Sequence, residues 1–91
     1  MKQLIWSRLA RQDLYHIAFD EMLLDADSLI SRIENAPLIL PDFPELGEQI
    51  WPVGRRNWRI KGTPFLLLYR VQSEAIEISR VRHVREDWQS A

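Results

Sequence analysis

Basic side chains gather in the second half of this sequence, and their chemistry is anion binding. Residues 54–91 hold eight arginine and lysine residues against four acidic ones, whereas residues 1–53 hold four basic and nine acidic residues. The net charge of −1 therefore hides a basic half and an acidic half. Guanidinium groups bind phosphates and carboxylates bidentately, so the basic half predicts an anionic partner, either a nucleic acid or an acidic peptide. The alternative is an ordinary solvated arginine surface.

Part of this basic group could carry out catalysis. Arginines that converge on a sheet face stabilise the charge that builds up during RNA cleavage, and a histidine can transfer protons near neutral pH. For His83 we favour a structural alternative, a residue at a strand end that bonds the backbone or a carboxylate. Arg70 and Arg80 could instead form ion pairs across strands. If the chain is a ribonuclease, its catalytic set would be Arg56, Arg59, Lys61, Arg82 and His83.

Other kinds of site are not expected. The sequence has no cysteine and only two histidines, so we expect no metal site, and it has no glycine-rich phosphate loop or nucleophile elbow that would indicate a cofactor or a known catalytic class. No apolar run approaches the roughly 20 residues that cross a bilayer, and the N-terminal segment lacks the apolar core of a signal peptide. We therefore expect a cytoplasmic protein that does not enter a membrane.

Three consecutive strands are expected to position the basic side chains. Residues 58–61 alternate apolar and charged side chains, as a half-buried strand does. Residues 65–69 are apolar on both faces, which predicts a central strand covered on both sides. Residues 75–83 carry three branched apolar side chains among polar ones and predict a third strand. Short turn-like segments at 62–64 and 72–74 link the three.

A short strand and two helices are predicted before this meander. Leu4–Trp6 predicts the strand, and Ser7 is a suitable N-cap for a helix from about residue 8 to residue 21. A second amphipathic helix begins near residues 24–27, and Pro37 should kink or end it. Residues 41–54 are rich in proline and glycine, so we expect a loop there with little regular structure.

The predicted element order is β-α-α-β-β-β in a single domain, residues 1–91. This order is typical of an α+β fold in which an antiparallel helical hairpin packs on a mainly antiparallel sheet. We expect the large apolar rings of Trp51, in the loop, and of Trp88, in the tail, to pack against this domain.

Five motifs follow one another along the chain and together span nearly all of it. They are Trp6-Ser7 with Ala10, Asp13, Leu14 and Ile17; Phe43-Pro44 with Gly47; Gly54 with Arg56; Gly62-Thr63-Pro64-Phe65 with Leu67 and Tyr69-Arg70-Val71; and Ile76, Ile78, Arg80-Val81, His83 and Trp88. In this order they resemble the RelE/ParE toxin superfamily. Membership implies a RelE/ParE-like fold and a growth-inhibiting toxin of a bacterial type II toxin–antitoxin pair. It also implies a cognate antitoxin that forms a hetero-oligomer with the toxin and orders a partly disordered segment on it.

The superfamily divides into two activities, and the resemblance favours one of them. RelE-like members cleave mRNA on the ribosome with basic residues, whereas ParE-like members inhibit DNA gyrase without that catalytic set. This chain has Leu66 and Val84 at or near positions where the RelE pattern has basic residues, and Trp88 cannot act as an acid or base. A ParE-like, non-enzymatic gyrase inhibitor is therefore the favoured interpretation, with a RelE-like endoribonuclease as the alternative. The residues expected to bind target or antitoxin are Arg55, Arg56, Arg59, Arg70, Arg80, Arg82, His83, Arg85 and Trp88.

Overall fold

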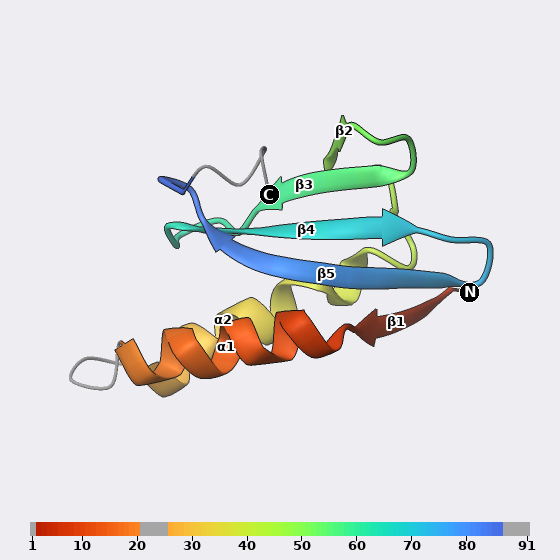
Figure 1. Ribbon diagram of the computed structural model, residues 1–91. Coiled ribbons are helices and arrows are strands. Elements are labelled where there is room, and N and C mark those ends of the chain that lie inside the picture. Colours follow the sequence, from red (N-terminus) through yellow and green to blue (C-terminus); the bar gives the residue numbers. More distant parts are fainter. Residues whose placement is uncertain (1, 21–25, 87–91) are drawn as a thin grey trace.

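One five-stranded sheet carries two helices against a single face (Figure 1). The structure is a computed structural model, and it describes residues 2–20 and 26–86. The elements are β1 (Gln3–Trp6), α1 (Arg8–Asp20), α2 (Ala26–Asn35), a 3-10 helix η1 (Ala36–Ile39), β2 (Glu48–Ile50), β3 (Arg55–Arg59), β4 (Phe65–Val71) and β5 (Ala75–His83).

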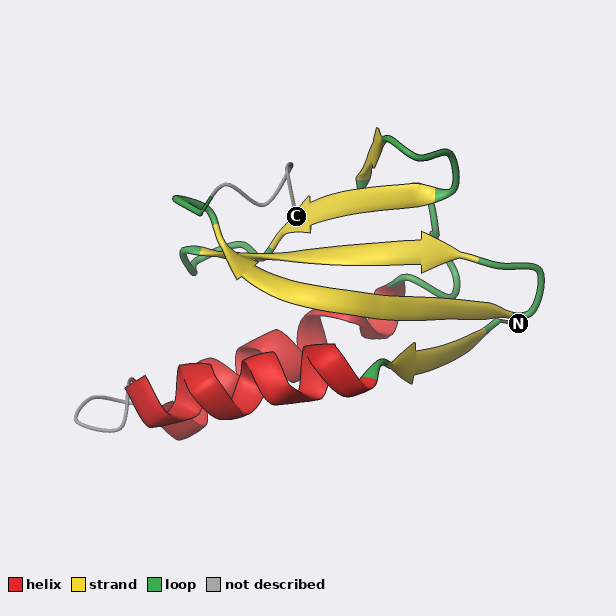
Figure 2. Cartoon of the chain, viewed as in Figure 1, coloured by secondary structure: helices red, strands yellow, loops and turns green. Residues whose placement is uncertain are grey.

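The strand order in the sheet is β1-β5-β4-β3-β2, so the first strand of the chain lies beside the last. β1 runs parallel to β5, and the three other pairs are antiparallel. The two helices lie side by side on the same face, and the other face carries no described helix (Figure 2). The predicted α+β class with a helical hairpin on a mainly antiparallel sheet is confirmed.

Ser7 joins the start of α1 to the sheet. Its hydroxyl accepts a hydrogen bond from the amide of Ala10 at 3.0 Å, which confirms the predicted N-cap. The same hydroxyl donates to the carbonyl oxygen of Ser79 in β5 at 2.8 Å. The first turn of α1 is therefore fixed against the middle of β5.

The region predicted to be irregular contains two short elements. α2 ends at Asn35, as expected for a helix that meets Pro37, but the chain continues as the 3-10 helix η1. Proline is tolerated there because the first residues of a helix donate no internal hydrogen bond. β2 is a three-residue strand that pairs with β3 at the edge of the described sheet, and such a short edge strand leaves little signal in the sequence.

The core fills the space between the helices and one face of the sheet. Tyr69, Ile76 and Ile78 are fully buried on the sheet side, and Ala10 and Ile33 are fully buried on the helices. None of the described helices has the length and apolar character needed to cross a membrane.

The expectation that Trp51 packs against the domain is wrong. Its side chain is 84% exposed, and that of Val53, two residues later, is 78% exposed. Both lie in the turn between β2 and β3, at the edge of the sheet farthest from β1 in strand order. The expectation for Trp88 lies outside the described residues.

Candidate functional site

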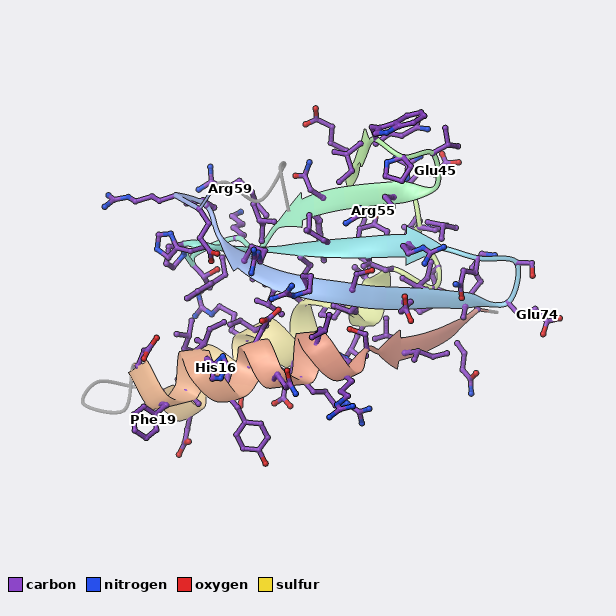
Figure 3. The ribbon with its side chains drawn as sticks, in the orientation of Figure 1. His16, Phe19, Glu45, Arg55, Arg59 and Glu74 are labelled. Carbon is purple, nitrogen blue, oxygen red and sulfur yellow. The ribbon has the colours of Figure 1, made fainter. Side chains whose placement is uncertain are left out.

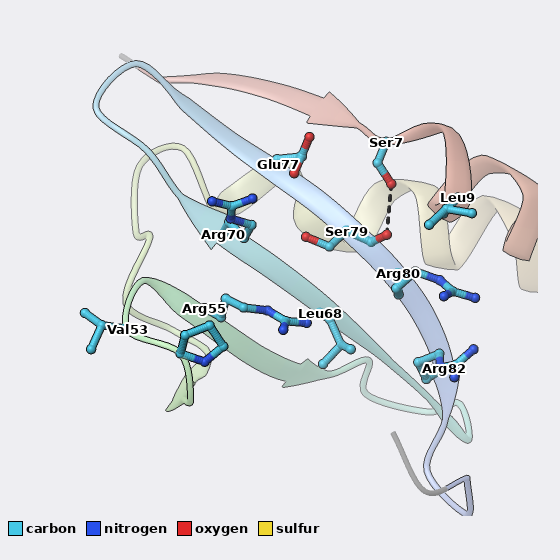
Figure 4. Close-up of a pocket in the computed structure, with 11 residues that line it drawn as sticks. Ser7, Leu9, Val53, Arg55, Leu68, Arg70, Glu77, Ser79, Arg80 and Arg82 are labelled. Carbon is cyan, nitrogen blue, oxygen red and sulfur yellow. Dashed lines mark hydrogen bonds between the residues drawn. The ribbon is translucent and has the colours of Figure 1, made fainter. Parts of the chain in front are cut away.

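A cavity of about 540 Å³ lies on the open face of the sheet and extends to the start of α1, and four arginines line it (Figure 4). We call it the arginine groove. Four of the binding residues predicted from the sequence meet there, although they come from three different strands. The lining residues are Arg55 of β3; Leu68 and Arg70 of β4; Glu77, Ser79, Arg80 and Arg82 of β5; Ser7; Leu9 of α1; and Pro52 and Val53 of the β2–β3 turn.

A β-bulge in β5 places two of the four arginines on this face. Leu68 pairs with Arg80 and Tyr69 pairs with Ile78, so Ser79 is an extra residue with no partner in β4. The bulge shifts the alternation of side chains by one residue. As a result Ile78 stays in the core while Arg80, two positions later, lies on the open face. The sequence contains a signal for this bulge, because the apolar residues Ile78 and Val81 are three positions apart, which strict alternation would place on opposite faces, and both are buried.

Asp13 of α1 holds Arg80 in place. The Asp13 carboxylate accepts two hydrogen bonds from the Arg80 guanidinium, at 2.8 and 2.9 Å, and a third from the backbone amide of Val81 at 2.9 Å. The hydrogen bond from Arg80 to Asp13 raises the pKa of Arg80 above its ordinary value. Arg80 therefore forms its ion pair with α1 and not across strands, which was the structural alternative considered from the sequence.

The groove combines positive charge with an apolar floor. Leu68 is only 2% exposed, and it lies between Arg80 on one side and Asn57 on the other in the register of the sheet. The Nε of Arg82 and the Oγ of Ser79 are buried and have no hydrogen-bond partner within the part of the chain that the structure describes. Buried donors without partners are uncommon in folded proteins. A ligand that carries carboxylates beside apolar groups would accept hydrogen bonds from these two donors and pack its apolar groups against Leu68.

The residues of the predicted catalytic set do not all share one face. Arg59 and Arg82 pair with Leu66 from opposite sides, so both belong to the open face. Arg56 pairs with Tyr69 on the helix side, and its guanidinium donates to the carbonyl oxygen of Gly47 at 2.6 Å. Lys61 follows β3 and lines a separate hollow with Trp58 and Arg59.

His83 has the backbone contacts of the structural alternative. Its ring packs edge-on against Phe65, with the ring centroids 5.4 Å apart. Its Nδ1 accepts a hydrogen bond from the amide of Arg85 at 3.1 Å, and its own amide donates to the Glu86 carboxylate at 2.9 Å. Only Nε2 is left to meet a ligand. Arg85 lies exposed in the turn after β5, and Trp88 is outside the described residues.

Tyr69 fixes the loop before β2 to the core. Its hydroxyl donates to the carbonyl oxygen of Pro44 at 2.7 Å and accepts from the amide of Gly47 at 2.8 Å. Burial raises the pKa of Tyr69, although the Gly47 amide and the charge of Arg56 act in the opposite direction. The phenol therefore stays protonated at physiological pH and acts as a structural hydrogen-bond donor.

Sequence reasoning missed the residues that position the site. The clustering of basic residues in the sequence does not point to Asp13, Ser7 or Ser79. Each of these three residues contacts a partner that is distant in the chain. The one available signal was Asp13 itself, an acidic residue beside the apolar stripe of α1. No group of three or more His, Cys, Asp or Glu residues that could hold a metal occurs in the described ranges, 2–20 and 26–86.

Comparison with known proteins gives consistent matches. The sequence matches the family described as "ParE toxin of type II toxin-antitoxin system, parDE" over residues 4–88. Among solved structures, it is similar to one of the chromosomal ParDE toxin–antitoxin system from P. aeruginosa, with 25% identity, a TM-score of 0.80, and coverage of 91% of this chain and 96% of that chain. No curated protein sequence matches.

Two further structures share the fold. One is the toxin–antitoxin complex RelBE2 from Mycobacterium tuberculosis, with 24% identity, a TM-score of 0.65, and coverage of 90% of this chain and 96% of that chain. The other is the YoeB dimer from Staphylococcus aureus, with 18% identity, a TM-score of 0.64, and coverage of 90% and 95%.

Proposed function

This chain belongs to the ParE toxin family of type II toxin–antitoxin systems, and we propose that it inhibits growth by binding DNA gyrase and is neutralised by a cognate antitoxin. The family match spans residues 4–88, and the similarity to the ParDE system of P. aeruginosa covers 91% of the chain. Gyrase acts on the chromosome, so the proposal places the toxin in the cytoplasm.

The burial of an apolar residue, Leu66, at this position is the observation that favours gyrase over mRNA as the target. RelE-like nucleases have a basic residue at the corresponding position, where it would face RNA. Here the side chain is apolar and only 2% exposed, between its register partners Arg59 and Arg82. A buried leucine cannot stabilise charge on a transferring phosphoryl group. This supports a toxin that acts by binding rather than by cleaving RNA.

The distribution of the other basic residues supports the same conclusion. RNA cleavage requires the acid, the base and the charge-stabilising groups within hydrogen-bond reach of one phosphate. Arg56 lies on the helix side and donates to Gly47, and His83 packs against Phe65. Arg82 faces the open side. The endoribonuclease alternative would need these three side chains to act from two faces of the sheet.

For the antitoxin, the arginine groove is the proposed contact. Asp13 already pairs with Arg80, and Glu86 lies 3.6 Å from Arg82, so Arg55 and Arg70 contribute most to favouring an anionic segment. The apolar members of the groove, among them Leu9 and Val53, favour side chains that a sugar–phosphate chain does not have. Glu77 also lines the groove, opposite Arg70 in register, and would repel a continuous row of phosphates. An acidic peptide with interspersed apolar residues fits this mixture, and binding would produce a toxin–antitoxin hetero-oligomer.

The first experiment follows macromolecular synthesis after induction of the chain in cells without antitoxin. Labelled thymidine, uridine and methionine are measured over the first minutes. We expect DNA synthesis to fail first, with an induced DNA-damage response and delayed loss of protein synthesis. An early fall in methionine incorporation while DNA synthesis continues would refute the gyrase proposal and support the ribosome as the target.

Removing groove arginines should weaken antitoxin binding. We expect Arg55→Ala and Arg82→Ala each to reduce antitoxin affinity about 10-fold, because each removes charge-assisted hydrogen bonds to a carboxylate. Isothermal titration calorimetry at two salt concentrations measures this, and the loss should be smaller at the higher salt concentration. Arg11→Ala, an exposed arginine on α1, is the matched control and should bind like the wild type. Equal losses in all three variants would contradict the groove as the binding site.

A further inference from the structure

We propose that the turn between β2 and β3 is an anchor that inserts Trp51 into an apolar pocket of the toxin's folded target, beside carboxylates that pair with Arg55 and Arg70. This inference rests on the proposed function, in that the chain is a toxin with a protein target. It adds the surface that contacts the target and the chemistry of the complementary pocket.

The exposure of the turn is the first observation. Trp51 is 84% exposed and Val53 is 78% exposed, whereas Trp6 and Trp58 are partly buried against the core. Pro52, between the two exposed side chains, is itself exposed, so three successive residues present an apolar surface to water. An indole that no part of the described chain covers is a strong indication of a binding site, because tryptophan is enriched among the residues that dominate binding energy at interfaces.

The turn is held in place, which suits an anchor. The amide of Arg55 donates to the carbonyl oxygen of Pro52 at 3.2 Å, and the amide of Val71 in β4 donates to the carbonyl oxygen of Gly54 at 3.0 Å. Gly54 has a φ of +94°, a left-handed conformation that favours glycine. Because the backbone is already ordered, little conformational entropy remains to be lost when Trp51 binds.

The charges next to the turn define the partner. Pro52 and Val53 line the arginine groove together with Arg55 and Arg70, and Arg55 is the register partner of Arg70 (Figure 4). The apolar anchor and the positive charge therefore form one continuous surface. The complementary surface is an apolar pocket with acidic side chains at its rim on the side of the groove.

A folded target fits the anchor better than a segment that orders on binding. A projecting side chain on a rigid turn needs a preformed concave pocket, and such pockets are built by folded domains. An antitoxin segment that orders on the toxin would instead follow the concave arginine groove. The two partners would thus share the arginines, and only the folded target would depend on Trp51.

The test compares Trp51→Ala with Trp51→Phe and with the control Phe19→Ala. Phe19 is also an exposed aromatic residue, at 72%, but it lies on the side of α1 that faces away from the sheet (Figure 3). Neither Trp51 nor Phe19 supports the core, so the three variants should fold. Each variant is assayed for growth inhibition after induction without antitoxin, for inhibition of gyrase supercoiling in vitro, and for antitoxin affinity by calorimetry.

We expect Trp51→Ala to weaken target inhibition about 30-fold, the effect of losing a central interface residue, and to change antitoxin affinity by less than about 3-fold. Trp51→Phe should restore part of the activity, and Phe19→Ala should behave like the wild type. If Trp51→Ala is as toxic as the wild type, the inference is wrong. It is equally wrong if Trp51→Ala loses antitoxin affinity to the same extent as toxicity, because the antitoxin would then occupy the anchor.

The gyrase assay separates this inference from the proposed function. A wild-type chain that stops growth but leaves supercoiling unaffected would refute gyrase as the target. The growth assay would still decide the role of Trp51, because toxicity is measured whatever the target is.

Discussion

Replacing Asp13 by alanine is expected to lower the free energy of unfolding by about 3 kcal/mol, the range for losing several charge-assisted hydrogen bonds at a partly buried carboxylate. The Asp13 side chain is 11% exposed and accepts three hydrogen bonds, two from Arg80 and one from Val81. Without it, the Val81 amide at the edge of β5 has no acceptor. Arg80, whose side chain is 30% exposed, recovers part of its hydration, so the loss stays below the sum of the three bonds.

Urea denaturation followed by circular dichroism measures this change. Asp20→Ala is the matched control, since Asp20 is an exposed carboxylate of the same helix and should change stability by less than about 0.5 kcal/mol. Asp13→Asn keeps an acceptor for Val81 but removes the charge, and we expect an intermediate loss. A loss below about 1 kcal/mol for Asp13→Ala would show that the contact contributes little more than a surface ion pair.

Replacing Gly47 by alanine is expected to destabilise the protein by about 3 kcal/mol, at the upper end for overpacking a filled site. A Cβ at this position would lie 2.6 Å from the Tyr69 hydroxyl and 2.8 Å from the carbonyl oxygen of Asn57. The second contact is with backbone, which cannot move aside as a flexible side chain can. Relief of the clash would also stretch the 2.8 Å hydrogen bond from the Gly47 amide to Tyr69.

A double-mutant cycle with Tyr69→Phe tests the cause of this effect. Tyr69→Phe removes the closest clashing atom and the hydrogen bond together, so Gly47→Ala should be less harmful in the Tyr69→Phe background than in the wild type. The free energies of unfolding of the four proteins give the coupling. Strictly additive losses would mean that the damage arises at the ring carbon Cε1 of residue 69, 2.7 Å from the added Cβ, and at Asn57, and not at the Tyr69 hydroxyl.

The order of the elements, apart from η1 and β2, could be predicted from the sequence because its signals are local. Alternation in residues 58–61, the apolar run of residues 65–69 and the turn residues between strands each depend on neighbours in the chain. The alternation places the strand too late, since β3 begins at Arg55 and ends at Arg59. The N-cap at Ser7 is similarly a local choice, and the structure confirms it. Residues 65–69 are buried on both faces, as predicted, although described helices cover only one of these faces.

The positioning of the site could not be predicted because it depends on pairs that are distant in the chain. Asp13 and Arg80 are separated by 67 residues, and nothing near Arg80 in the sequence distinguishes its partner from Glu77. The expectation for Trp51 failed for a different reason. Burial of a large apolar side chain depends on whether another element covers it, and none of the described elements covers the Trp51 side chain. The general preference of tryptophan for the interior then gives the wrong answer at this turn.

The parallel pairing of β1 with β5 has a consequence for how this protein folds. The β3–β4 and β4–β5 hairpins close over a few residues, whereas Ser7 meets Ser79 only after a loop of 72 residues closes. Closing the longer loop loses more chain entropy, and contacts between distant residues slow folding. The antiparallel meander should therefore form first, and β1 with α1 should dock last. Until that step Arg80 has no Asp13 to hold it, so the toxin completes its arginine groove only at the end of folding.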